Sequence, residues 1–144
     1  MRIVTAFGIT RDQVIAHQRV DNGPGWAVVQ LATAGEVLDL APDLSQIPDA
    51  MVGAIGEHLP GSPQDYEMRT FAPRVGVAED PACGSMNAAV AQWLVRAGAV
   101  SAPYRVAHGQ RLGRAGDIHI RPDSEGTVWV GGAVTTLFRG TVDA

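Results

Sequence analysis

FAPRVGVAEDPACGSMNAAVAQWLVRAG, residues 71–98, is the stretch that decides the fold. An acidic pair and a turn of small residues precede a helix that the pattern predicts over residues 85–96, and Gly98 supplies the usual stop. From residue 86 to residue 97 the polar side chains are Asn87, Gln92 and Arg96, so apolar side chains occupy nearly the whole circumference. A helix that is apolar all round is buried on all sides. We therefore expect a sheet curled around this helix.

Most of the remaining chain is predicted to form strands. Short runs of β-branched and aromatic residues predict strands at residues 26–31, 51–55, 66–71, 104–107, 117–121, 127–130 and 133–139. We also expect a short helix over residues 10–17 with Thr10 as its N-cap, one helical turn over residues 36–40, and a loop over residues 72–82. The predicted fold class is α+β, a mixed β-sheet curled around one buried central helix, with residues 1–144 forming a single domain.

The composition excludes several classes of protein. The 144 residues suffice for one core, and a net charge of -4 without a basic run argues against nucleic acid as a partner. All 11 cationic side chains are arginine, which excludes a lysine-type phosphate loop and a Schiff-base lysine. The single cysteine excludes an internal disulfide. No apolar run approaches the ~18 residues of a membrane helix and no signal-peptide pattern is seen, so we expect a cytoplasmic protein without a membrane partner.

The start of the predicted helix is the candidate site. The first turn of a helix leaves backbone N–H groups unpaired, and the helix dipole favours negative charge there. Small residues in this turn let a ligand carboxylate or enolate oxygen reach the N–H groups of Gly84, Ser85 and Met86. Asp80 lies beside them, where a carboxylate can carry a proton. The alternative is that Asp80 or Ser85 only caps the helix, with Pro81 at its first position.

Two further features border this site. Cys83 lies in the same turn; a thiol near a helix N-terminus can act as nucleophile or proton carrier, whereas a lone cysteine is otherwise a small apolar filler. The loop of residues 21–25 offers Asn22 and Gly23 as ligand-binding residues in front of Trp26, which either walls a pocket or belongs to the core. The four histidines show no ligand spacing with one another or with Cys83, so we expect no metal site.

Three further blocks accompany that site in a fixed order: VDNGPGW at residues 20–26, GQRLGRAGDIHI at 109–120 and VWVGGAVTTLFRG at 128–140. Together with FAPRVGVAEDPACGS at 71–85, they make essentially the whole chain resemble the PhzF-like family of phenazine-biosynthesis proteins. Members of that family resemble diaminopimelate epimerase in fold, with two similar halves and the active site in the cleft between them. Each half is a mixed sheet curled around a central helix. The resemblance implies that residues 1–144 correspond to the second half.

Carried over by position, the resemblance implies roles for three residues. Asp80 matches the acidic residue of the second half, and Ser85 matches the serine that helps to bind substrate. Cys83 stands where the phenazine enzyme usually has threonine and where diaminopimelate epimerase has a catalytic thiol. The family's general-base glutamate belongs to the first half. Glu79 cannot replace it, because a residue adjacent to Asp80 cannot lie on the opposite wall of the same cleft.

The function that the resemblance implies is isomerisation or epimerisation without a cofactor: a proton is removed from and returned to a small carboxylate-bearing substrate. This chemistry needs a second half, either an identical chain in a homodimer or a separate first-half chain. A two-fold homodimer would bring two Asp80 and two Cys83 side chains around one cleft, and could exchange the strand expected at residues 133–139. The alternative is a non-catalytic module that keeps the fold and a small-anion pocket.

Overall fold

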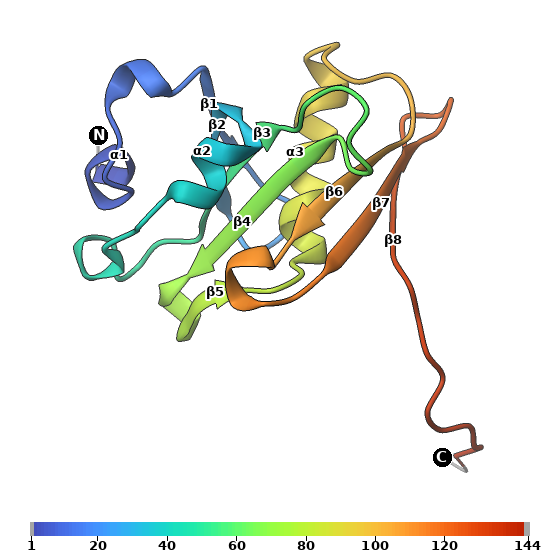
Figure 1. The fold of residues 1–144 in the computed structure, drawn as a ribbon. Coiled ribbons are helices and arrows are strands. Elements are labelled where there is room, and N and C mark those ends of the chain that lie inside the picture. The colour runs from blue at the N-terminus through green and yellow to red at the C-terminus, as the bar shows by residue number, and fades with distance from the viewer. Residues whose placement is uncertain (1, 143–144) are drawn as a thin grey trace.

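The computed structural model describes residues 2–142, which form one mixed sheet with helices on both of its faces (Figure 1). The strands are β1 (Ala16–Val20), β2 (Trp26–Thr33), β3 (Val52–Glu57), β4 (Tyr66–Ala72), β5 (Val77–Asp80), β6 (Tyr104–His108), β7 (Gly116–Pro122) and β8 (Val128–Gly131). The helices are α1 (Arg2–Ala6), α2 (Ala34–Asp39) and α3 (Gly84–Arg96), with 3₁₀ turns at Arg11–Gln13, Leu44–Gln46, Pro73–Val75 and Gln110–Leu112. Over residues 2–142, no helix is long and apolar enough to cross a membrane.

The strand order is β1-β2-β3-β4-β6-β7-β8, and β5 pairs with β4 beside this path. Two neighbouring pairs are parallel, β2 with β3 and β4 with β6, and the others are antiparallel. A parallel pair needs a long crossover connection. Here α2 lies in the connection from β2 to β3, and α3 lies in the connection from β4 to β6. The predicted α+β class with a curled mixed sheet is confirmed.

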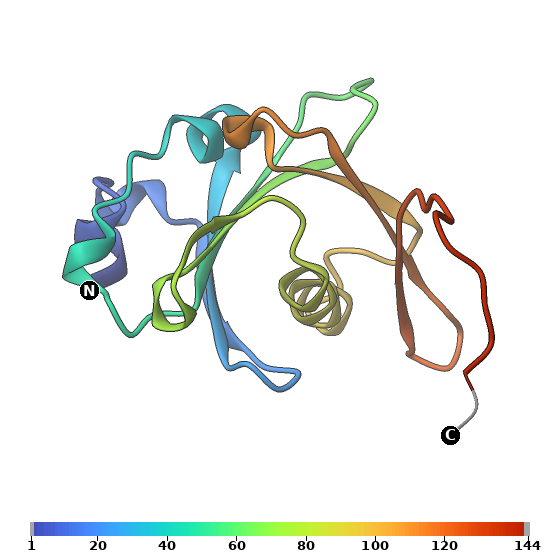
Figure 2. The same ribbon diagram turned by 90° about the horizontal axis from the view of Figure 1, so that it is seen from below.

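The sheet arches over α3, which lies on its concave side (Figure 2). Side chains alternate between the two faces of a strand, so every second residue of each strand points towards this helix. They form a core with the inner residues of α3; the strands contribute Trp26, Val28, Ile55, Met68, Val106, Ile118 and Ile120. The side chains on the other face of the strands form a second core with α1 and α2, in which the rings of Phe7 and Phe71 meet edge to face at 5.4 Å.

The helix predicted over residues 85–96 is confirmed as α3, but it is not buried on all sides. Met86, Ala89, Val90 and Leu94 are buried against the sheet. Four residues at helical spacing, Ser85, Ala88, Gln92 and Val95, are only partly buried. They form one stripe, the side of α3 that the arch leaves uncovered.

Three local predictions were wrong. The helix expected over residues 10–17 is only the 3₁₀ turn Arg11–Gln13, although Thr10 and Gln13 do form its capping box. From Ala16 the chain belongs to β1, which pairs with β2 across the turn at residues 21–25. The loop expected over residues 72–82 contains β5. Residues 133–139 form no strand; the chain beyond β8 runs away from the sheet with Val134, Leu137 and Phe138 exposed (Figure 1).

Candidate functional site

The acidic pair at the end of β5 is divided between the two faces of the sheet, because successive strand residues point in opposite directions. Glu79 faces the convex side and accepts two hydrogen bonds from Arg69, at 2.9 Å to Oε1 and 2.8 Å to Oε2. Arg69 also donates to the carbonyl that follows α2, Leu40 O, at 2.7 Å. Glu79 is therefore held in a structural ion pair, and Asp80 alone remains beside the start of α3.

The first turn of α3 presents free backbone donors. The N-cap residue is Cys83, whose side chain makes no capping hydrogen bond among residues 2–142, and the first helical hydrogen bond runs from Asn87 N to Cys83 O at 3.2 Å. The N–H groups of Gly84, Ser85 and Met86 precede that bond. Asp80 does not cap the helix, because its Oδ1 accepts from Ala82 N at 2.9 Å instead. The geometry disagrees with the simple capping alternative.

Ser85 is held in place by the loop before β2. Asn22 Nδ2 donates to the Ser85 carbonyl at 2.9 Å, and Trp26 Nε1 donates to Ser85 Oγ at 3.1 Å. The indole N–H can only donate, so the serine hydroxyl accepts from it and keeps its own hydrogen for another partner. Trp26 is both a core residue, 3% exposed, and a contact of the site. Gly23 lies in the same loop but its N–H donates to Asp21 at 2.8 Å, away from α3.

The thiol of Cys83 is a buried group, with 6% of the residue exposed. Its Sγ lies 3.5 Å from Ser85 Oγ. Burial raises the pKa of this thiol above its ordinary value, and the contact with the Ser85 hydroxyl opposes the rise only in part. The protonated form therefore dominates at neutral pH, which differs from the lowered pKa that a position at a helix N-terminus usually gives.

A cavity of about 520 Å³ opens at this turn. Its lining is mostly apolar or backbone and comes from Ala82, Gly84, residues 115–118 and residues 130–134. Two glycines allow the wall to approach the acidic turn: a Cβ on Gly109 would lie 2.5 Å from Pro81 O, and one on Gly116 would lie 3.1 Å from the same atom. Of the predicted site residues, Gly84 alone lines this cavity. Asn22 and Cys83 are brought to Ser85 beside it, while the Met86 side chain lies in the core and contributes only its backbone.

Two buried residues of this site were not among the predicted ones. Asn87 Nδ2 donates to Cys83 O at 2.8 Å and contacts His108 Nδ1 at 3.2 Å. His108 has no exposed surface, and burial lowers its pKa although Asp80 and Glu79 act in the opposite direction. The signal in the sequence was Asn87, a polar residue on an otherwise apolar face. Nothing local connected it to a histidine on a distant strand.

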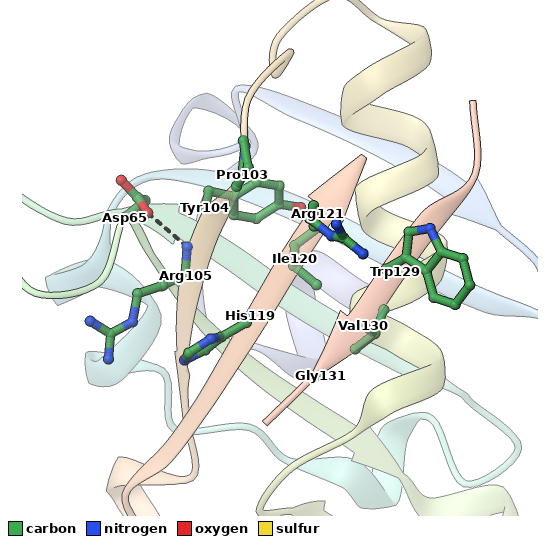
Figure 3. Close-up of a pocket in the computed structure, with 10 residues that line it drawn as sticks. All are labelled: Asp65, Pro103, Tyr104, Arg105, His119, Ile120, Arg121, Trp129, Val130 and Gly131. Atoms are coloured by element: carbon green, nitrogen blue, oxygen red, sulfur yellow. Dashed lines mark hydrogen bonds between the residues drawn. The ribbon is translucent and has the colours of Figure 1, made fainter. Parts of the chain in front are cut away.

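A second hollow, of about 660 Å³, lies on the outer face of β6, β7 and β8 (Figure 3). It includes Arg105, whose guanidinium pairs with Asp117 and whose backbone N donates to Asp65 at 2.7 Å. Arg121 lies 6.0 Å from the centre of the Trp129 ring. None of the predicted site residues lines this hollow, so the candidate site is the start of α3. Among the described residues, no three His, Cys, Asp or Glu side chains are grouped as metal ligands.

The chain is similar to several known proteins. The chain is 31% identical to "Antisense-enhancing sequence 1" of Schizosaccharomyces pombe over 137 residues, 84% of this chain and 44% of that protein. It is 27% identical to the "Uncharacterized isomerase YddE" of Escherichia coli over 94% of this chain and 52% of the relative. It superposes on a predicted epimerase of Pseudomonas aeruginosa with a TM-score of 0.69 at 26% identity, covering 96% of this chain and 50% of the other.

The chain therefore spans about half the length of the relatives that it matches. A PhzF-family protein of Bacillus anthracis shares the fold at 14% identity, with a TM-score of 0.67 over 90% of this chain and 53% of that one. Residues 3–140 match the family described as phenazine biosynthesis-like protein, PhzC-PhzF. This match covers nearly the whole sequence, and the chain belongs to the PhzC-PhzF family.

Proposed function

We propose that this chain supplies the second half of an isomerase or epimerase site that moves a proton on a small carboxylate-bearing substrate without a cofactor. The observation that carries the proposal is the start of α3, where the N–H groups of residues 84–86 precede the first helical hydrogen bond and Ala82 and Gly84 line a cavity of about 520 Å³. The names of relatives, an uncharacterized isomerase and a predicted epimerase, support the same class of reaction.

In this proposal the helix start binds the anion and Asp80 carries the proton. Removing a proton next to a carboxylate or carbonyl places negative charge on oxygen, and backbone N–H groups with the positive end of a helix dipole stabilise that charge. Ser85 adds a hydroxyl donor because its oxygen already accepts from Trp26. Cys83 acts in its protonated form, as a neutral neighbour of Ser85, since burial raises the pKa of its thiol.

The second half of the site comes from a partner chain, either an identical copy or a separate first half. Three features support this. The stripe Ser85, Ala88, Gln92 and Val95 is left partly uncovered. The strands β1 and β8 end the sheet with one unpaired edge each. In the segment after β8, Val134 is 89% exposed, Leu137 is 78% exposed and Phe138 is 93% exposed. We propose that residues 133–139 pair with the partner, as an exchanged strand does in a two-fold dimer.

Exchange of substrate hydrogen with solvent tests the activity. A panel of small chiral carboxylates, among them amino acids and hydroxy acids, is incubated with the protein in D₂O, and the proton next to the carboxylate is followed by ¹H NMR. We expect loss of that signal for at least one class, abolished by Asp80→Asn and reduced by Ser85→Ala, while Glu125→Gln on an exposed turn has no effect. Binding without exchange, also in the presence of a first-half chain, would instead favour the non-catalytic anion-binding module.

Sedimentation tests the assembly. Leu137→Asp with Phe138→Asp should convert an associated species into a monomer, because charges would replace the apolar side chains that enter the partner. Ser101→Asp with Ala102→Asp is the matched control, adding the same charge in the exposed loop before β6, outside this segment. A wild-type chain that stays monomeric at micromolar concentration, alone and with a first-half chain, would refute the proposed pairing.

A further inference from the structure

The side chain of His108 is, with Asn87 Oδ1, one of two buried polar groups at the site whose hydrogen bonding is incomplete among the described residues. It lies at the end of β6 with no exposed surface, opposite Met68 of β4 and Gly116 of β7 in the sheet. Its Nδ1 contacts Asn87 of α3 at 3.2 Å, whereas its Nε2 has no hydrogen-bond partner among the described residues. A buried donor or acceptor without a partner costs about 1–3 kcal/mol, so its presence beside a candidate site asks for an explanation.

The contact with Asn87 decides where the proton of the ring lies. The amide nitrogen of Asn87 carries two hydrogens, and one of them is donated to Cys83 O at 2.8 Å. A carbonyl oxygen can only accept, so rotating the amide by half a turn would bring two oxygens together. The second amide hydrogen therefore points to His108 Nδ1, which must accept it with a lone pair. A neutral ring with a lone pair on Nδ1 carries its proton on Nε2.

The charged groups that act on the ring come from β5. The negative charge of Asp80 favours the protonated form of the ring, and Glu79 adds a weaker effect in the same direction. The carbonyl of Pro81 closes over the glycine that follows the ring, since a Cβ on Gly109 would meet it at 2.5 Å. From α3 the group that faces the ring is the uncharged Asn87. Asp80 is therefore the charged group of β5 on the side of α3, since Glu79 is paired with Arg69 on the convex side of the sheet.

We propose that His108 is a positioning residue for the proposed site: its neutral ring, by accepting from Asn87, keeps the Asn87 amide on Cys83 O at the start of α3, and protonation of the ring breaks that contact. A second proton would have to sit on Nδ1, directly against the hydrogens of Asn87. To accept it, the Asn87 amide must rotate and give up Cys83 O, which is also the first carbonyl of the helix. Only one consequence of this inference rests on the proposed function: that the site binds its ligand more weakly in acid.

The first test follows the ring itself by long-range ¹H–¹⁵N NMR on the full chain, with His108→Gln to assign the resonances. At pH 7 we expect a protonated Nε2 and an unprotonated Nδ1, retained well below pH 6.5, because burial lowers the pKa of this histidine. In Asn87→Asp the carboxylate can accept a proton from Nδ1, so the ring should take up its second proton at higher pH. A proton on Nδ1 at pH 7 in the wild type would overturn the assignment.

The second test asks whether the ring positions the site. The amide resonances of Gly84 and Ser85 should shift with the same midpoint as the His108 ring, and this shift should vanish in His108→Gln, whose amide keeps a donor near the Nε2 position. His119→Gln, on the outer face of the sheet, should leave the shift unchanged. Amide shifts that do not follow the ring would overturn the positioning role even if the proton lies on Nε2.

Oxalate, added as a probe dicarboxylate, connects the inference to binding. Its dissociation constant, read from the Gly84 and Ser85 amides, should rise at least threefold when the His108 ring becomes protonated, and should not rise in His108→Gln. An equal rise in His108→Gln would overturn the inference. If oxalate and the other small carboxylates bind nowhere near α3, the proposed function fails, whereas the ring and amide titrations still decide the role of His108.

Discussion

Glu67 in β4 has no exposed surface, and replacing it by glutamine should change how the free energy of unfolding depends on pH. Its Oε2 accepts from Gln110 Nε2 at 2.9 Å and lies 3.2 Å from His58 Nε2, while Oε1 has no partner within the described residues. Burial raises the pKa of this carboxyl group from 4.5 to about 7; Arg69 opposes the rise and Glu79 adds to it. The folded chain thus holds a proton that the unfolded chain releases.

The sign follows from which state loses the proton first. Below pH 4.5 both states are protonated and the contribution of Glu67 to stability is fully present; as pH rises towards 7 the unfolded state ionises alone, and that contribution is lost. One pKa unit corresponds to about 1.4 kcal/mol. Between pH 5 and pH 8 the titration of Glu67 therefore lowers the free energy of unfolding by about 2 kcal/mol. The glutamine variant does not titrate and lacks this loss.

Urea unfolding of the wild type and Glu67→Gln at pH 5, 6, 7 and 8 measures the effect. The difference, wild type minus variant, should fall by about 2 kcal/mol across this range, because the titration of groups that do not contact Glu67 cancels in the comparison. Glu125→Gln, at an exposed turn, should give a difference that does not depend on pH. A difference that is flat, or that rises with pH, would refute the reasoning that Glu67 is protonated in the folded chain.

Three further substitutions test packing, each by urea unfolding at pH 7. Gly109→Ala should cost about 1–3 kcal/mol more than Gly113→Ala, because both positions have left-handed φ values of 81° and 65° but a Cβ meets a carbonyl only at the first; equal costs would contradict this. Arg69→Met should cost about 3–5 kcal/mol by leaving Glu79 unpaired, and adding Glu79→Leu should recover most of it; without recovery, the ion pair is not the cause. Leu94→Ala should cost about 2–5 kcal/mol as a large-to-small change in the core, and a cost below 1 kcal/mol would place this residue outside it.

The parts of the fold that could be predicted from sequence are those determined by local pattern. Helix α3 was predictable because its apolar face and the glycine that follows it are properties of a few neighbouring residues. That glycine, Gly98, adopts a left-handed backbone conformation with φ 70°. The segment at residues 10–17 shows the limit. Its helical spacing is real, but pairing of β1 with β2 through the tight turn at 21–25 satisfies more backbone groups than one isolated helical turn can.

The strand predicted at residues 133–139 and the unpredicted place of His108 in the site show a different limit. The β-branched and aromatic residues of this segment are typical of a strand. A strand exists only beside another strand, however, and the described chain offers none there. The candidate site could be proposed from sequence because Asp80, Ser85 and the helix start lie within one short stretch. His108 could not be predicted, because its relation to Asn87 depends on the register in which β6 lies beside β4.

The two crossover connections also bear on the order in which the protein folds. The hairpins β3–β4 and β6–β7–β8 are close in sequence, so their pairing needs only short loops to close. The parallel pairs β2–β3 and β4–β6 must wait until residues 34–51 and 73–103 have been brought round. Non-local pairing of this kind slows folding. We expect α3 to dock late, against hairpins that already exist, so the residues of the site would be among the last to reach their native positions as the chain folds.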